Sequence, residues 1–165
     1  MSPTWTHLPW HDLRADQLYD VVKLRQDVFV VEQDCAYPDL DGRDPEALHL
    51  LGYDGATLVA YLRLFPPTPH GERRDAVIGR VIVAASHRGT GLGVRLMREG
   101  FEQVQLLWGP TPVFVSAQAH LRRFYRGLGY RVCGEGYDED GIPHLPMRHP
   151  GPASVPSIPS MPRSS

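Results

Sequence analysis

The placement of proline sets the strongest limit on what this chain can fold into, because proline interrupts helices and central strands. The 165 residues contain 16 prolines, which cluster so that long stretches remain free of them. Regular structure can fill those stretches, which are 11–37, 46–65, 70–109 and 113–142. Five of the last sixteen residues are proline and five are serine, a composition typical of disorder. We therefore expect one domain over 1–149 and a disordered tail over 150–165.

Net charge and cysteine content exclude several classes of protein. The formal net charge is −2, which argues against a broadly basic nucleic-acid-binding protein. Two cysteines are too few for a disulfide framework, so Cys35 and Cys133 are expected to be reduced thiols rather than a single bridge. No stretch approaches the roughly 20 apolar residues of a membrane span. We expect a cytoplasmic protein without a metal site, since His7 and His11 lack supporting cysteines or acids.

Residue periodicity predicts the order of helices and strands. Apolar positions recur at helical spacing over 15–31, and this helix precedes two strands at 47–53 and 57–65. Asp54-Gly55 between those strands is a strong hairpin signal. The remaining predicted elements are strands at 76–83, 113–118, 130–137 and 142–147, and helices at 91–107 and 120–128. This order predicts an α+β fold with a mixed sheet.

Two segments within this framework carry further expectations. The segment 34–46 is rich in aspartate but lacks the spaced carboxylates and the closing glutamate of a calcium loop, so we expect a solvated turn. Gly79 lies inside the predicted strand 76–83, where glycine indicates a bulge or a close approach of another backbone.

The segment Arg88-Gly89-Thr90-Gly91-Leu92-Gly93 is the clearest chemical signal, since it joins a Val/Ile-rich strand to an amphipathic helix. Backbone N–H groups in such a turn and the helix dipole favour phosphate, and Arg88 can add a charged contact. A Walker loop needs a lysine that is missing here. A dinucleotide fingerprint needs G-x-G-x-x-G, whereas this chain has G-x-G-x-G. Another kind of phosphate site and a plain glycine-rich turn both remain open on spacing alone.

The pattern R-x-x-G-x-G after a strand resembles the pyrophosphate-binding motif of the GNAT superfamily of acyl-CoA N-acyltransferases. The resemblance extends over about residues 10–149 and includes V-F-V-S-A-Q-A-H-L-R-R-F-Y-R-G-L-G-Y at 113–130. Shorter blocks resemble the ElaA-like branch: V-F-V-V-E-Q at 28–33, D-x-D-G at 39–42, I-G-R-V-I-V at 78–83, A-Q-A-H at 117–120 and D-G-I-P-H at 140–144. The asparagine often found after the family's fifth strand is absent, and Gln118 or His120 stands nearby. The resemblance implies a mixed, mostly antiparallel central sheet flanked by helices.

The same resemblance implies an N-acetyltransferase that moves an acetyl group from acetyl-CoA directly to a primary amine. It assigns backbone contacts with pantetheine to Val81 and Val83, and proton donation to the departing CoA thiolate to Tyr125. The pyrophosphate would be held by Arg88, Gly89, Thr90, Gly91, Leu92 and Gly93. The acceptor would be a small molecule or a peptide, bound near segments 34–46 and 66–75. The enzyme would be a monomer or a homodimer.

Several side chains are candidates for the remaining roles. The general base is Glu32, His49, His120 or His144, acting directly or through water. Arg63 and Arg80 either select an acidic substrate group or pair with a carboxylate. Arg122 and Arg126 either reach the CoA 3′-phosphate or form a solvated helix face. Cys35 and Cys133 lack an adjacent base, which disfavours a covalent acyl-cysteine route.

Two other functions stand as alternatives. A non-catalytic acyl-CoA-binding sensor module would keep the glycine turn at 88–93 and transfer no acyl group, although the presence of Tyr125 argues against it. A Rossmann-type oxidoreductase comes third, because the spacing of the glycines departs from the dinucleotide fingerprint.

Overall fold

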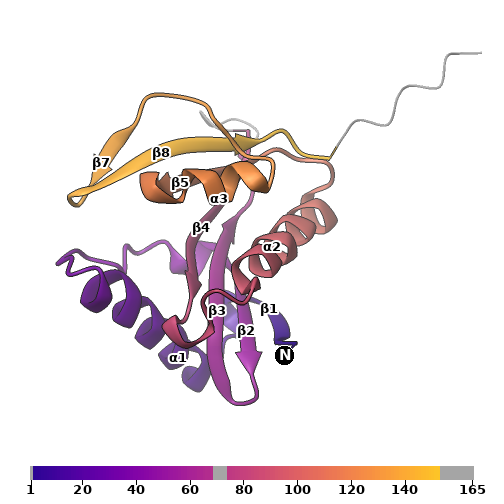
Figure 1. Cartoon of the computed structure of the whole chain (residues 1–165). Coiled ribbons are helices and arrows are strands. Elements are labelled where there is room, and N and C mark those ends of the chain that lie inside the picture. The colour runs from indigo at the N-terminus through magenta and orange to yellow at the C-terminus, as the bar shows by residue number, and fades with distance from the viewer. Residues whose placement is uncertain (1, 69–73, 153–165) are drawn as a thin grey trace, which may run out of the picture.

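The computed structural model describes residues 2–68 and 74–152 (Figure 1). Most of the tail expected over 150–165, and the centre of the loop expected over 66–75, lie outside the described residues. Within the described ranges, eight strands form one sheet in the order β1-β2-β3-β4-β5-β8-β6, and β7 pairs with β8. Helices pack on both faces of the sheet. The mixed, mostly antiparallel sheet flanked by helices is therefore confirmed.

The first half of the sheet is an antiparallel meander of β1 (Thr4–Pro9), β2 (Leu48–Asp54), β3 (Thr57–Phe65) and β4 (Ala76–Val83). The predicted β2–β3 hairpin is confirmed, and Gly55 takes the first turn position with a φ of 60°. Strand β1 was not predicted, because Pro3 and Pro9 bracket it. As an edge strand it tolerates proline at its ends.

The second half consists of β5 (Val113–Gln118), β6 (Arg131–Val132), β7 (Tyr137–Glu139) and β8 (Ile142–His149). The single strand predicted over 130–137 is wrong, since the chain instead forms the two short strands β6 and β7, both paired with β8. Two glycines lie between them at points of close approach. A Cβ on Gly136 would lie 3.2 Å from the carbonyl oxygen of His144, and one on Gly134 would lie 3.1 Å from Pro146.

The two halves meet where β4 and β5 run parallel over only three residue pairs, from Ala76 opposite Val113 to Ile78 opposite Val115. Beyond these pairs, β4 continues to Val83 and β5 to Gln118 without pairing to each other. The sheet therefore opens between its two central strands, and this opening positions the candidate site.

The main helices are α1 (Ala15–Arg25), α2 (Leu92–Trp108) and α3 (Arg122–Gly127). The helix predicted over 15–31 changes at Gln26 into a π-helix that runs to Glu32. Such wider turns are frequent at functional sites, because they redirect side chains. Short 3₁₀ turns at Trp10–Asp12, Asp44–Glu46, Ala85–His87 and Ala119–Leu121 complete the elements.

Two apolar clusters hold the helices against the sheet. Leu62 and Leu64 of β3 pack with Leu96 of α2, whereas Tyr61, next to Leu62, packs with Val21 of α1. This alternation follows the two-residue period of a strand. Within the described residues, none of the helices has the length and apolar character to cross a membrane.

Candidate active site

A cavity of about 960 Å³ occupies the opening between β4 and β5. Its lining comes from both strands, the π-helix, the glycine turn, the start of α3 and the β7–β8 turn. The structure brings most of the predicted site residues together here, namely Glu32, Val81, Val83, Arg88, Gly89, Gly91, Leu92, Gly93, His120, Tyr125 and His144. Thr90 and His49 are not among the residues that line the cavity.

The free edge of β4 forms one wall of the cavity. The N–H of Ala84 donates to the carbonyl oxygen of Val59 on β3. Since hydrogen-bonding directions alternate along a strand, Val81 and Val83 turn their backbone groups towards the side where β5 has diverged. An extended ligand carrying amide groups could therefore continue the ladder at these two residues. Arg88 already donates from Nε to the carbonyl oxygen of Val83, at 3.1 Å.

A β-bulge interrupts β4 just before this edge. The register between β3 and β4 shifts between Tyr61 and Arg63, which confirms the bulge expected near Gly79. The residue in the left-handed region is Arg80, with a φ of 52°, and not Gly79. Arg80 donates from Nη2 to the carbonyl oxygen of Asp39 at 3.0 Å. This contact helps to hold a conformation that is uncommon for residues other than glycine.

The glycine turn, residues 88–93, lines the cavity with Gly89, Gly91 and Gly93 among its members. Gly89 and Gly91 have φ values of 73° and 79°, which L residues rarely adopt. Gly91 is the N-cap of α2, and no side chain of the described residues caps the helix there. The first turn of α2 also contains no acidic residue. Its N–H groups and the positive end of its dipole are therefore available to an anion.

Arg88 and Glu32 form an ion pair across the mouth of this turn. Two guanidinium nitrogens of Arg88 donate to the two carboxylate oxygens of Glu32, and the Nη2–Oε2 distance is 2.7 Å. The guanidinium of Arg88 holds the pKa of the Glu32 carboxyl below its ordinary value. Glu32 is thus a weak base in this geometry, and the charge of Arg88 is already balanced in part.

Tyr125 reaches the cavity from α3. Its ring is 5 % exposed and makes edge contacts with Phe124 and Tyr130, at centroid distances of 5.1 and 5.9 Å. Burial raises the pKa of the Tyr125 hydroxyl to about 12. The group is accordingly a neutral hydrogen-bond donor over the whole physiological range of pH.

His144 lies across the cavity on β8, opposite Gln118 of β5. Its Nδ1 donates to the carbonyl oxygen of Ile142 at 2.7 Å, which leaves the lone pair of the neutral ring on Nε2. That nitrogen lies 3.4 Å from the Glu139 carboxylate, and the ring stacks on Tyr137. A fixed tautomer beside a carboxylate is an arrangement typical of general bases.

The other two histidine candidates have different surroundings. His120 is exposed on the 3₁₀ turn after β5 and lines the cavity. His49 is fully buried on β2, where its Nε2 donates to the carbonyl oxygen of Asp44 and its Nδ1 accepts from the Tyr61 hydroxyl. Burial lowers the pKa of His49. Both ring nitrogens are already in use, so His49 serves the fold.

The acidic segment 34–46 is not the solvated turn that the sequence suggested. Asp39 and Asp44 are buried, and three arginines meet the aspartates of this segment. The close contacts are Arg25 with Asp39 and Asp44 at 2.7 and 2.6 Å, Arg63 with Asp41 and Asp44 at 2.6 and 3.0 Å, and Arg80 with Asp39 at 2.9 Å. Arg63 and Arg80 therefore pair with carboxylates, as one of the two expectations held. The signal that could have revealed the network was Arg25 on the apolar stripe of its helix, which requires a buried partner.

Two further contacts across the cavity were missed by the sequence analysis. Gln33, at the end of the π-helix, and Gln118, at the end of β5, exchange side-chain amide hydrogen bonds of 3.1 and 3.2 Å. Cys35 Sγ donates to the carbonyl oxygen of Asp140 in the β7–β8 turn at 3.3 Å. These contacts join the two halves of the molecule. Arg122 and Arg126 stay exposed on α3 and do not line the cavity.

A diverging β4–β5 pair, a glycine turn capping the next helix and a tyrosine on the helix after β5 agree with a comparison against protein families. The profile of the Acetyltransferase (GNAT) domain matches residues 26–149. The chain belongs to the GNAT acetyltransferase family.

Individual relatives place this GNAT protein in the ElaA-like branch. It is 43% identical over 145 residues to the protein ElaA of Escherichia coli strain K12. The matched region covers 87% of this chain and 94% of that relative. The crystal structure of Escherichia coli ElaA superimposes with a TM-score of 0.82 at 40% identity, covering 89% of this chain and 99% of that one. The crystal structure of an acyl-CoA N-acyltransferase from Pseudomonas aeruginosa superimposes with a TM-score of 0.81 at 42% identity. The match covers 88% of this chain and 99% of that one.

Proposed function

We propose that this GNAT protein transfers an acetyl group from acetyl-CoA directly to a primary amine of a small molecule or a peptide. The observation that carries the proposal is the single cavity that joins the open edge of β4, the glycine turn and Tyr125. From its pyrophosphate to its thioester, an acyl-CoA needs an anion site, then partners for its pantetheine amides, and then a hydrogen-bond donor at the sulfur. The cavity supplies these three features in one continuous space.

The donor would lie along β4 with its pyrophosphate on the glycine turn. Val81 and Val83 would exchange hydrogen bonds with the pantetheine amides, much as a missing strand would. The N–H groups at the start of α2 and the guanidinium of Arg88 would hold the pyrophosphate. The thioester would then lie between the diverging strands near Tyr125. A requirement for acetyl-CoA also fits the cytoplasmic location expected from the sequence.

Tyr125 would stabilise the leaving thiolate as a hydrogen-bond donor and not by complete proton transfer. A thiol has a pKa near 8.5, whereas burial raises the pKa of Tyr125 to about 12. Full transfer of the proton would therefore be uphill by about 5 kcal/mol. A short hydrogen bond to the developing charge avoids that penalty and is stronger in the transition state than in the ground state.

The acceptor amine needs a base, and we assign this role to His144. An amine with a pKa near 10.4 is about 0.04% neutral at pH 7, so deprotonation costs about 4.6 kcal/mol. The lone pair of His144 Nε2 can take that proton, and the nearby carboxylate of Glu139 can attract the cationic amine and stabilise the imidazolium. Replacing His144 with Gln should lower kcat by about a hundredfold or more while the affinity for CoA is retained. An unaltered kcat would transfer the role to His120 or to water.

The decisive experiment measures CoA thiol release from acetyl-CoA in the presence of a panel of primary amines, peptides and diamines. Acetyl transfer predicts release above background with at least one acceptor, together with an acetylated product detected by mass spectrometry. The alternative, a non-catalytic sensor, predicts tight binding of acetyl-CoA by calorimetry and no release with any member of the panel. Propionyl-CoA and succinyl-CoA in the same assay test the preference for acetyl.

A further inference from the structure

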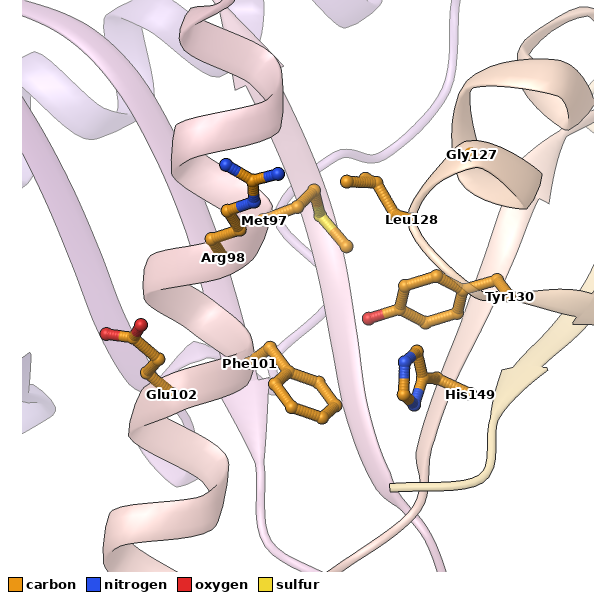
Figure 2. A pocket seen from close by; sticks show the side chains of 8 residues that line it. All are labelled: Met97, Arg98, Phe101, Glu102, Gly127, Leu128, Tyr130 and His149. Carbon is orange, nitrogen blue, oxygen red and sulfur yellow. The ribbon is translucent and has the colours of Figure 1, made fainter. Parts of the chain in front are cut away.

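A second cavity of about 220 Å³ lies between α2, the end of α3 and the end of β8 (Figure 2). None of its lining residues also lines the candidate active site. The space is therefore separate from the proposed acetyl-transfer chemistry, and nothing in that chemistry uses it.

Tyr130 supplies an unusual feature in this cavity. Its side chain is 2 % exposed, and its buried hydroxyl has no hydrogen-bond partner within the described part of the chain. Figure 2 shows the hydroxyl pointing away from its own backbone and towards α2. Buried hydroxyl groups are nearly always paired, because an unpaired one loses its hydrogen bonds to water without compensation. The cavity thus contains a donor that lacks an acceptor.

His149 and Arg98 are the nitrogen-bearing side chains that line this space. The backbone N–H of Gly151 donates to His149 Nδ1 at 3.0 Å, so the neutral ring carries its proton on Nε2. Burial lowers the pKa of His149, which favours this neutral form. Arg98 of α2 brings a guanidinium to the rim, while the carboxylate of Glu102 points away from Tyr130 and His149 in Figure 2. The polar groups of the cavity are therefore mainly donors.

The remaining walls are aromatic or apolar. The ring of His149 contacts those of Phe101 and Tyr130, at centroid distances of 4.6 and 5.3 Å. Met97 and Leu128 complete the lining. An apolar cavity of about 150 Å³ is large enough to bind benzene. A volume of about 220 Å³ therefore accommodates one six-membered ring with a small substituent.

We propose that this cavity is a binding site for a small monocyclic aromatic carboxylate. The ring would pack among Phe101, His149 and Leu128, and the carboxylate would accept hydrogen bonds from the Tyr130 hydroxyl and the Arg98 guanidinium. The aromatic walls select the ring, and the donors select the anion. This proposal does not rest on acetyl transfer, because the cavity and its donors are present whether or not the protein is catalytic.

The test is a titration of the isotope-labelled protein with benzoate, followed by NMR, with CoA present to occupy the active-site cavity. We expect shifts of amide signals confined to α2, the end of α3 and the end of β8, with a Kd of about a millimolar. Benzamide, which lacks the charge, should bind about tenfold more weakly. Shifts that map to the β4–β5 opening, or the absence of shifts with benzoate, would overturn the proposal.

Variants make the assignment specific. Tyr130→Phe keeps the ring and should weaken benzoate binding about tenfold, because it removes a hydrogen bond to a charged acceptor. Arg123→Gln is the matched control, since this exposed arginine of α3 lines neither cavity. Equal affinity of Tyr130→Phe and the unaltered protein would refute the site. Leu128→Phe, which fills the cavity with a ring, should abolish binding and provides a second variant if Tyr130→Phe fails to fold.

Discussion

At the scale of single residues, hydrogen-bond partners decide which candidate side chains are free to act. Glu32 is paired with Arg88, and both nitrogens of His49 are occupied. His144 instead has one nitrogen fixed by Ile142 and the other available beside Glu139. Residue type alone made these three groups equivalent candidates. The difference between them comes from partners that lie up to 56 positions away in the chain.

Replacing Tyr125 with Phe tests the proposed proton donor. Because the hydroxyl would act mainly in the transition state, kcat should fall by about ten- to a hundredfold while the affinity for CoA barely changes. Thiol release gives kcat, and calorimetry gives the Kd of CoA. Tyr19→Phe on the exposed face of α1 is the control and should leave both values unaltered. Full turnover by the Tyr125 variant would remove this residue from the mechanism.

Replacing Glu32 with Gln tests the role of the ion pair at the glycine turn. Freed from its carboxylate, Arg88 can give its whole charge to the pyrophosphate, so CoA should bind about two- to fivefold more tightly at low salt. Calorimetry at low and high ionic strength measures this, with Glu46→Gln on the exposed 3₁₀ turn as a control. Weaker binding would show that Glu32 orients Arg88 for the ligand. A hundredfold loss of kcat would restore Glu32 as the base.

At the scale of elements, local signals predicted well wherever the cause was local. The β2–β3 hairpin, the glycine turn and the apolar face of α2 each follow from residues adjacent in the sequence. Strand β1 pairs with β2 across 39 to 49 positions of the chain, from Pro9 with Leu48 to Thr4 with Tyr53, and its own sequence is bracketed by prolines. The division of 130–137 into two strands likewise depends on β8, which both short strands meet.

The candidate site was likewise predicted where its signals are local and missed where its contacts are distant in the sequence. Its glycine turn and Tyr125 were identified from contiguous motifs. The Gln33–Gln118 bridge joins residues 85 positions apart, and the partners of Arg25 lie 14 and 19 positions away in a segment that has the composition of a solvated turn. No periodicity marks such pairs, since each depends on how separate elements pack.

Replacing Gly129 with Ala tests the turn that leads from α3 into the second half of the sheet. Gly129 has a φ of 97°, and an added Cβ would lie 2.7 Å from His149 Nε2. The substitution should lower the free energy of unfolding by about 2 kcal/mol or more. Gly55→Ala is the control, because its φ is also positive but no atom lies within 4 Å of an added Cβ. Urea unfolding measures both, and an equal loss would show that the clash with His149 is relieved.

At the scale of the whole molecule, a buried network of arginines and aspartates joins α1, the acidic segment and the strands β3 and β4. Its members Arg25, Arg63, Asp39 and Asp44 are buried, and each is compensated by partners from other elements. Breaking such a network by removing one partner is strongly destabilising, because the opposite charge is left buried. Because Arg63 and Arg80 also line the cavity, the network couples this wall of the cavity to the stability of the fold.

This network predicts a loss of stability in acid. The guanidinium of Arg63 beside Asp41 holds the pKa of that carboxyl well below its usual range. A carboxyl with a lowered folded-state pKa contributes its full stabilisation above the unfolded value of about 3.8, and loses it as the pH falls further. Urea unfolding should therefore show stability that declines as the pH falls below about 4. Asp41→Asn should reduce the slope of this decline, and an unchanged slope would contradict the assignment.

The short parallel contact between β4 and β5 also shapes how the protein fluctuates. Within the sheet, only three residue pairs connect the two halves, and each half contains its own hairpin. Amide hydrogen exchange in the ligand-free state should therefore divide into two cooperative units that open separately. An acyl donor seated along the free edge of β4 would supply the hydrogen bonds that β5 does not make there. Its binding should slow exchange in both units together, so that the two units open as one cooperative unit when the substrate is bound.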